Sequence, residues 1–188
     1  MKAKNILIKI SYIALLSALT FICTYFIQIP YGGGSGYFNL SDSIIIFSSI
    51  YFGPVVGVFS GIIGATIADI ASGYASVAIF TIIAKGLEGI FAFLIYKWLF
   101  KAKYLRYLSF LIAPLFMVLS YFPYYLVFYE YNFASSILNS SFDLIQGYIN
   151  AALAFSLLFI FNRIELKEKY NYLKEKRKKN LKKIDQTK

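Results

Sequence analysis

The segment KWLFKAKYLR, residues 97–106, carries four basic side chains and separates two long apolar stretches of the chain. Three more basic residues lie within the first nine positions, and eleven lie between Arg163 and the C-terminus. Of the 19 Lys and Arg residues, only Lys85 lies outside these three clusters. Basic residues are retained on the cytoplasmic side of a membrane, so this spacing predicts an integral membrane protein with both termini in the cytoplasm.

The composition supports this class. The 188 residues are 59% hydrophobic and only 15% charged, which is outside the range of soluble domains. The net charge of +10 is therefore a topology signal and does not indicate nucleic-acid binding. The absence of histidine argues against His-based catalysis and most transition-metal sites, so no metal, cofactor or catalytic residue is expected. The single cysteine, Cys23, is expected to be a small packing residue.

Six apolar segments are expected to form transmembrane helices, for which about 20 residues are normally needed. The first is read as a retained helix and not as a cleaved signal peptide, and the second is short. We predict an all-α bundle of six transmembrane helices over residues 1–163, followed by a basic cytoplasmic tail over 164–188 that is solvated or lies on the membrane surface. The expected helices cover approximately residues 8–29, 40–51, 54–71, 76–99, 108–128 and 142–161.

Two external loops are predicted between these helices. The glycine-rich sequence YGGGSGY at 31–37 includes Gly32, Gly33 and Gly34, so it is expected to be a mobile loop. A second loop is expected over residues 129–140, which contain Glu130 and no Lys or Arg.

Small side chains recur at helical spacing in two of the predicted helices. In the third, one row runs from Gly53 through Gly57 and Gly61 to Ala65, and a second row contains Ser60 and Gly64. Such rows let a neighbouring helix approach closely within the bundle. In the first helix, Ala14 and Ala18 form an Ala-x-x-x-Ala pair, for which internal packing and an external partner helix both remain possible.

Ionisable residues inside membrane segments are expensive and often functional. Lys85 and Glu88 are three residues apart and could pair with each other or face a cavity. Asp42 could cap its helix or contact a ligand, and Asp69 could bond to free amides or contact a ligand. Counted from the external ends of their helices, the three aspartates Asp42, Asp69 and Asp143 lie in the outer leaflet.

Further polar and aromatic residues complete a candidate pocket. Asp143, Gln146 and Asn150 fall on one stripe of the sixth helix, which either hydrogen-bonds to other helices or faces water. Aromatic residues at the outer end of the fifth helix form either an interfacial belt or a stacking wall; they are Tyr121, Tyr124, Tyr125 and Phe128. Together these residues would suit a small, polar, ring-containing solute.

Several motifs between residues 36 and 89 are similar to those of the substrate-binding S components of energy-coupling factor (ECF) vitamin transporters. They are GYFNLSD at 36–42, FGPVVG at 52–57, Ala68-Asp69, Ser72-Gly73-Tyr74 and KGLEG at 85–89. Within that family the chain most resembles the riboflavin-type or hydroxymethylpyrimidine-type branch. The resemblance extends from residue 8 to about residue 161 and implies a multi-pass protein of the bacterial cell membrane.

The resemblance also implies partners and roles. Ala14 and Ala18 match the motif that docks S components on a membrane-embedded coupling subunit, and Gly32 to Gly36 match the loop that covers the ligand. Two cytoplasmic ATPases would supply the energy; the chain itself has no Gly-x4-Gly-Lys-Ser/Thr motif. The residues expected to bind the vitamin are Asn39, Asp42, Asp69, Tyr74, Lys85, Glu88, Tyr121, Tyr125, Gln146 and Asn150.

The expected function is therefore capture of a water-soluble vitamin or precursor at the external face for ATP-driven uptake. The excess of acidic residues over Lys85 suits a neutral or weakly basic ligand, which favours hydroxymethylpyrimidine or a pyridoxine-like compound. The alternatives are a riboflavin carrier of the same superfamily and a membrane assembly protein without transport activity. An intramembrane enzyme is not expected, because no convincing nucleophile and base are present.

Overall fold

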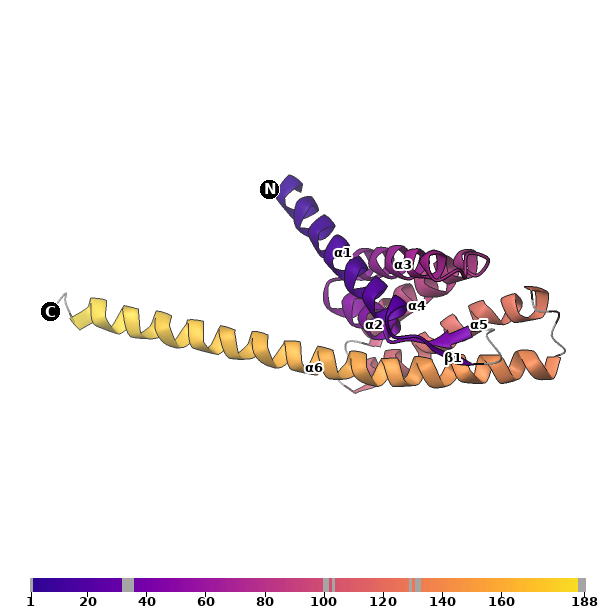
Figure 1. Cartoon of the computed structure of the whole chain (residues 1–188). Coiled ribbons are helices and arrows are strands. Elements are labelled where there is room, and N and C mark those ends of the chain that lie inside the picture. Colours follow the sequence, from indigo (N-terminus) through magenta and orange to yellow (C-terminus); the bar gives the residue numbers. More distant parts are fainter. Residues whose placement is uncertain are drawn as a thin grey trace. The chain divides into compact units, whose positions relative to one another are not determined.

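A computed structural model describes residues 2–31, 36–99, 102, 104–128, 130 and 133–185, with side chains described up to residue 168 (Figure 1). The chain divides into two compact units, Met1–Phe155 and Ser156–Lys188. The first unit contains the first five α-helices, the start of the sixth, the hairpin and the cavity discussed below. The second unit is helical up to Asp185.

The described part of the chain contains six α-helices, which confirms the all-α class. A 3-10 helix, η3 (Leu105–Leu108), and a two-stranded hairpin accompany them. The α-helices are α1 (Lys2–Tyr25), α2 (Ser41–Tyr51), α3 (Pro54–Ala71), α4 (Ala78–Trp98), α5 (Ser109–Phe128) and α6 (Phe133–Asp185).

Five helical segments are long and apolar enough to cross a bilayer. The exception is α2, whose 11 residues span only about 16 Å at 1.5 Å per residue, compared with a hydrocarbon core of about 30 Å. The sequence had indicated that this helix is short. The candidate spans are Lys4–Tyr25, Pro54–Ala71, Ala78–Trp98, Leu105–Val127 and Phe133–Glu168.

The segment between α1 and α2 differs from the prediction. Helix α1 ends at Tyr25 and not near residue 29, and the chain then forms strands β1 (Ile29–Tyr31) and β2 (Gly36–Phe38), which pair antiparallel. Pro30 contributes to the early end, because its ring would clash with the carbonyl of Phe26, four residues earlier, if the helix continued. Part of the expected loop is therefore a hairpin. Its central residues, which include Gly32, Gly33 and Gly34, lie outside the described residues.

Helix α6 also differs from the prediction, since it begins at Phe133, nine residues before the expected start. Residues 133–140 of the expected external loop are therefore helical, and polar side chains in this part of α6 bond back to the preceding turn. Asn139 donates to the carbonyl of Ser135, and Ser141 donates to that of Ile137. The predicted domain boundary at residue 163 lies inside α6 and remains a prediction.

Rows of small residues on α3 permit close packing on two sides. A side chain at Gly57 would overlap Ser49 of α2, and one at Gly61 would lie 2.8 Å from Ile45 of the same helix. A side chain at Gly64 would lie 2.7 Å from Thr20 of α1. One row therefore contacts α2 and the other contacts α1. In a membrane, where apolar surface alone does not drive association, such backbone proximity is a main source of packing energy.

Candidate ligand-binding site

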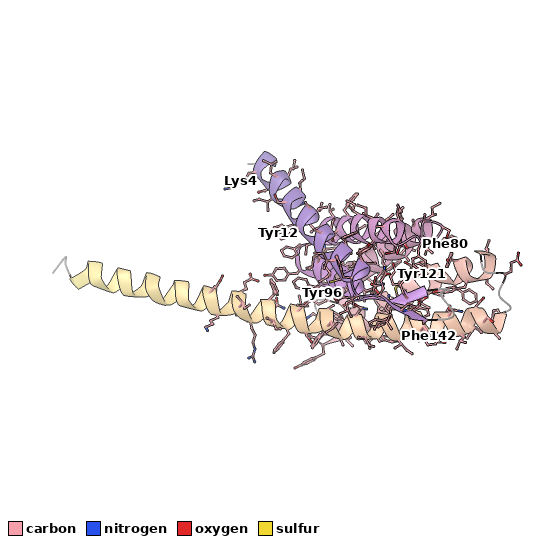
Figure 2. All side chains as sticks on the ribbon, viewed as in Figure 1. Lys4, Tyr12, Phe80, Tyr96, Tyr121 and Phe142 are labelled. Carbon is pink, nitrogen blue, oxygen red and sulfur yellow. The ribbon has the colours of Figure 1, made fainter. Side chains whose placement is uncertain are left out.

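The first unit encloses a cavity of about 50 Å³ beneath the hairpin. Residues from α1, the hairpin and helices α3 to α6 form its wall, and Tyr121 of α5 is labelled in Figure 2. The wall combines hydroxyl, amide, carboxylate and ammonium groups with several aromatic rings. Its residues are Thr24, Tyr31, Gly36, Tyr37, Asn39, Ala65, Asp69, Tyr74, Val77, Thr81, Lys85, Tyr121, Tyr124, Tyr125, Asp143 and Gln146.

The carboxylate of Asp143 accepts hydrogen bonds from two phenols. Tyr31 of β1 donates to Oδ1, and Tyr125 of α5 donates to Oδ2 at 2.7 Å. The ring of Tyr31 also stacks on that of Phe142, with centroids 4.9 Å apart. The hairpin is thus attached to α5 and α6 through one acidic residue.

The carboxylate of Asp69 on α3 has a similar pair of donors. Tyr37 of β2 donates to Oδ1, and the hydroxyl of Thr81 on α4 donates to Oδ2. Tyr121 in turn donates to the Thr81 hydroxyl at 3.0 Å. Asp69 thus accepts one bond from the hairpin and one from a helix, as Asp143 does.

Both hairpin phenols are protonated and can donate hydrogen bonds to the two carboxylates. Burial raises the pKa of Tyr31 above its ordinary value, and the adjacent carboxylate of Asp143 raises it further. Burial likewise raises the pKa of Tyr37, with Asp69 as the next cause. Both phenols therefore stay protonated at neutral pH.

An ion pair lies at the inner side of the cavity. The ammonium of Lys85 donates to Oδ1 of Asp42, and the two side chains are 3% and 0% exposed. Gln146 of α6 donates to the other carboxylate oxygen of Asp42 at 2.9 Å. The Lys85 ammonium also lies 5.8 Å from the centroid of the Tyr121 ring. Both charges are paired and hydrogen-bonded, as burial requires.

The start of α2 is held by amide side chains from α6. Gln146 accepts from the backbone N–H of Asn39 at 3.0 Å. Asn150 accepts from the backbone N–H of Ser43 at 3.1 Å and donates to the carbonyl of Asn39 at 2.8 Å. These bonds satisfy backbone groups that would otherwise be unpaired at membrane depth. For Asn150, the geometry therefore agrees with the inter-helix alternative.

Seven of the ten residues predicted to bind the vitamin lie on the cavity wall: Asn39, Asp69, Tyr74, Lys85, Tyr121, Tyr125 and Gln146. Three lie behind it: Asp42, Glu88 and Asn150. The structure pairs Lys85 with Asp42, and the described residues contain no pair between Lys85 and Glu88. Within that same part of the chain, neither oxygen of the buried Glu88 carboxylate has a hydrogen-bond partner.

Sequence reasoning missed three residues that donate hydrogen bonds to the two carboxylates, namely Tyr31, Tyr37 and Thr81. Tyr31 and Tyr37 flank the glycine-rich segment, and Thr81 precedes Lys85 by one helical turn. Asp143 was assigned to the polar stripe but not to the binding set. The spacing of Thr81 and Lys85 could have identified the threonine, whereas the role of the tyrosines depends on the hairpin. The described residues contain no group of three or more His, Cys, Asp or Glu that could hold a metal ion.

Comparison with known proteins agrees with this architecture. The S component of a bacterial ECF transporter superposes with a TM-score of 0.61 at 18% sequence identity, covering 90% of this chain and 99% of that one. At this identity the match establishes the fold alone. An uncharacterized protein of Pyrococcus woesei is 41% identical over 69 residues, which cover 37% of this chain and 46% of that protein.

The fold and the spans thus define a multi-pass membrane protein with the S-component architecture. Residues 4–163 match the model of the ECF-type riboflavin transporter S component family. The chain belongs to this family, which consists of transporter components and not of enzymes. The membership confirms the resemblance noted in the sequence and favours a transport function over the assembly role.

Proposed function

We propose that this S component captures riboflavin at the external face of the membrane and presents it for ATP-driven uptake. The support for this ligand is the family match over residues 4–163, whose description specifies a riboflavin transporter. This proposal replaces our first preference for hydroxymethylpyrimidine or a pyridoxine-like compound. Riboflavin is a neutral molecule with a flat ring system and a hydroxylated chain, which agrees with the mixture of aromatic and hydrogen-bonding groups around the cavity.

The observation that carries the proposal is the grouping of rings and polar atoms on one wall. Tyr74, Tyr121 and Tyr124 offer aromatic surface, and Asn39 and Gln146 offer amide groups beside them. We assign ligand contacts to the seven predicted residues that line the cavity. Asp42 acts through Lys85, with which it pairs, whereas Asn150 bonds to the backbone of Asn39 and has a structural role.

A single-ring vitamin is the second candidate, and one observation favours it. The cavity of about 50 Å³ is far below the roughly 300–1,000 Å³ of typical ligand pockets, so any ligand must displace side chains. A compound the size of hydroxymethylpyrimidine or pyridoxine would displace fewer of them than riboflavin.

We further propose that α1 docks on a membrane-embedded coupling subunit, with two ATPases as the source of energy. Ala14 and Ala18 are both exposed on α1, where a partner helix can reach them. Ala18 also borders an apolar groove of about 460 Å³ between α1 and α3, opposite Ile63, Gly64 and Ile67. Small side chains beside a groove permit close approach of a second helix.

The test is binding by the purified chain without partners. The protein would be prepared in detergent and titrated with riboflavin, hydroxymethylpyrimidine and pyridoxine by isothermal calorimetry. Quenching of flavin fluorescence would provide a second signal for the first compound. We expect saturable binding of riboflavin with one site per chain, accompanied by quenching from contact with aromatic rings. Tighter binding of hydroxymethylpyrimidine or pyridoxine than of riboflavin would support a single-ring vitamin as the ligand. Binding of none of the three compounds would contradict the proposal.

A further inference from the structure

The hairpin tyrosines donate hydrogen bonds to two carboxylates of the cavity wall. Tyr31 takes one oxygen of Asp143, and Tyr37 takes one oxygen of Asp69. The second oxygen of each carboxylate is bonded to a helix residue, Tyr125 for Asp143 and Thr81 for Asp69. Each acid therefore has one donor from the helical bundle and one donor from the short hairpin above it.

Of the donors to these two carboxylates, the hairpin phenols are the ones that can most easily move away. Tyr31 and Tyr37 are half-buried and belong to strands of three residues each, whereas Tyr125 is 3% exposed and belongs to a 20-residue helix. The cavity of about 50 Å³ has room for only a few water molecules, each of which needs at least about 10–15 Å³ of such space. Entry of a vitamin therefore requires side chains of the wall to move.

Loss of the two phenols would leave each carboxylate with an empty acceptor position. An unpaired buried polar group is destabilising, and a charged one more so. The incoming molecule must therefore supply O–H or N–H donors in the same two places. A hydroxyl group is the nearest chemical equivalent of a phenol, because it is a neutral O–H donor of similar bond length.

We infer that Tyr31 and Tyr37 are specificity-determining residues that compete with hydroxyl groups of the ligand for Asp143 and Asp69. The ligand class that this selects is a ring compound with at least two hydroxyl donors. The inference rests on the proposed vitamin-binding function. It adds that the hydroxylated chain of riboflavin replaces the two phenols, so that affinity depends on how strongly the hairpin bonds are made.

One glycine provides an independent way to disturb this competition. Gly36 is the antiparallel partner of Tyr31, and a methyl group at Gly36 would lie 2.9 Å from the Tyr31 ring and hydroxyl oxygen. The ring would have to shift, although the phenol would remain in the protein and Asp143 would be unchanged. Gly36→Ala should therefore weaken the Tyr31 bond without removing a functional group from the site.

The experiment measures Kd for riboflavin and for lumiflavin, which has the same ring system with a methyl group in place of the hydroxylated chain. The variants are Tyr31→Phe, Tyr37→Phe and Gly36→Ala, with Tyr148→Phe as the control on the outer surface of α6. Each Phe variant keeps its aromatic ring, so we expect it to fold normally. Monodisperse elution and thermal unfolding check this expectation.

We expect wild-type protein to bind riboflavin at least about tenfold more tightly than lumiflavin, because lumiflavin leaves both acids unpaired. Each Phe variant should bind riboflavin about five- to tenfold more tightly than wild type, because the competing donor is gone. Gly36→Ala should change Kd in the same direction, and Tyr148→Phe should have no effect.

Equal or weaker riboflavin binding by both Phe variants would overturn the competition. Equal affinity of wild-type protein for the two flavins would overturn the hydroxyl requirement. Both results would leave the proposed function intact, since riboflavin would still bind. Absence of flavin binding by wild-type protein would instead contradict the proposed function and this inference together.

Discussion

The ammonium of Lys85 on α4 donates to the carboxylate of Asp42 in the first turn of α2, and both groups are almost completely buried. This contact joins two helices across the inner side of the cavity. Because neither charge is accessible to water, its partner provides most of the compensation for its desolvation. The pair is therefore the part of the site whose disruption should affect stability most strongly.

Asp42→Asn should lower the free energy of unfolding by about 3 kcal/mol, because Lys85 keeps a buried charge without a counter-charge. The double variant Asp42→Asn/Lys85→Met should recover at least half of that loss, because it removes the uncompensated charge. Thermal unfolding of the ligand-free protein in detergent is the measurement. Lys97→Met, at an exposed position of the same helix, should change stability by less than about 0.5 kcal/mol. Equal stability of the single and double variants would contradict the electrostatic explanation.

Gly57→Ala tests the close approach of α3 to α2. The new methyl group would overlap the Ser49 side chain and lie 2.5 Å from its Cα, so the helices must separate and about 1–3 kcal/mol of stability should be lost. Gly86→Ala on α4 is the matched control, because its methyl group would meet only Ile62 at 3.4 Å, an ordinary contact distance. In the same unfolding assay, the Gly86→Ala variant should be more stable than the Gly57→Ala variant. The reverse order would mean that the α2–α3 contact is looser than described.

Asn150→Ala separates a structural role from a ligand-binding role. The backbone N–H of Ser43 and the carbonyl of Asn39 would each lose a partner, and about 1–3 kcal/mol should be lost for each unpaired group. Because Asn150 does not line the cavity, riboflavin Kd of the remaining folded protein should stay unchanged. Ser141→Ala, which removes only an exposed bond within α6, should leave both quantities unaltered. A large loss of riboflavin affinity with no change in the free energy of unfolding would show that Asn150 contributes to ligand binding.

Ala18→Phe tests partner docking on α1. A bulky ring at this exposed position should keep another helix at a distance and abolish most vitamin uptake by cells that contain the coupling proteins. Vitamin binding by the isolated variant should be normal, because Ala18 is absent from the cavity wall. Leu119→Phe, at a site 68% exposed on α5, should leave both uptake and binding intact. Uptake that survives the Ala18 substitution would place the docking surface elsewhere.

The sequence was sufficient for the class and most of the helices. Basic clusters and long apolar segments located five membrane-crossing candidates, and Gly53-Pro54 marked the start of α3. Seven of the predicted site residues lie on one wall because polar side chains at membrane depth must face protein or water. This constraint acts on single positions and can be read without knowledge of the fold.

The parts that could not be predicted depend on partners that are distant in the chain. Lys85 has Glu88 one turn away, but its actual partner is Asp42, 43 positions earlier. Tyr31 and Asp143 are separated by 112 positions, and local sequence contains no signal for their contact. The hairpin was also hidden, because the glycines suggested irregular structure and strands of three residues have no periodicity to detect.

The brevity of α2 is one reason why a cavity can exist within a bundle of packed helices. A helix of about 16 Å spans only roughly half of the 30 Å hydrocarbon core of a bilayer. Asn39, which closely precedes α2, lies on the cavity wall, and the hairpin strands come immediately before it in the chain. Helical turns added before Ser41 would compete with Asn39 and the hairpin for the space beside the cavity, so the short length of α2 leaves room for it.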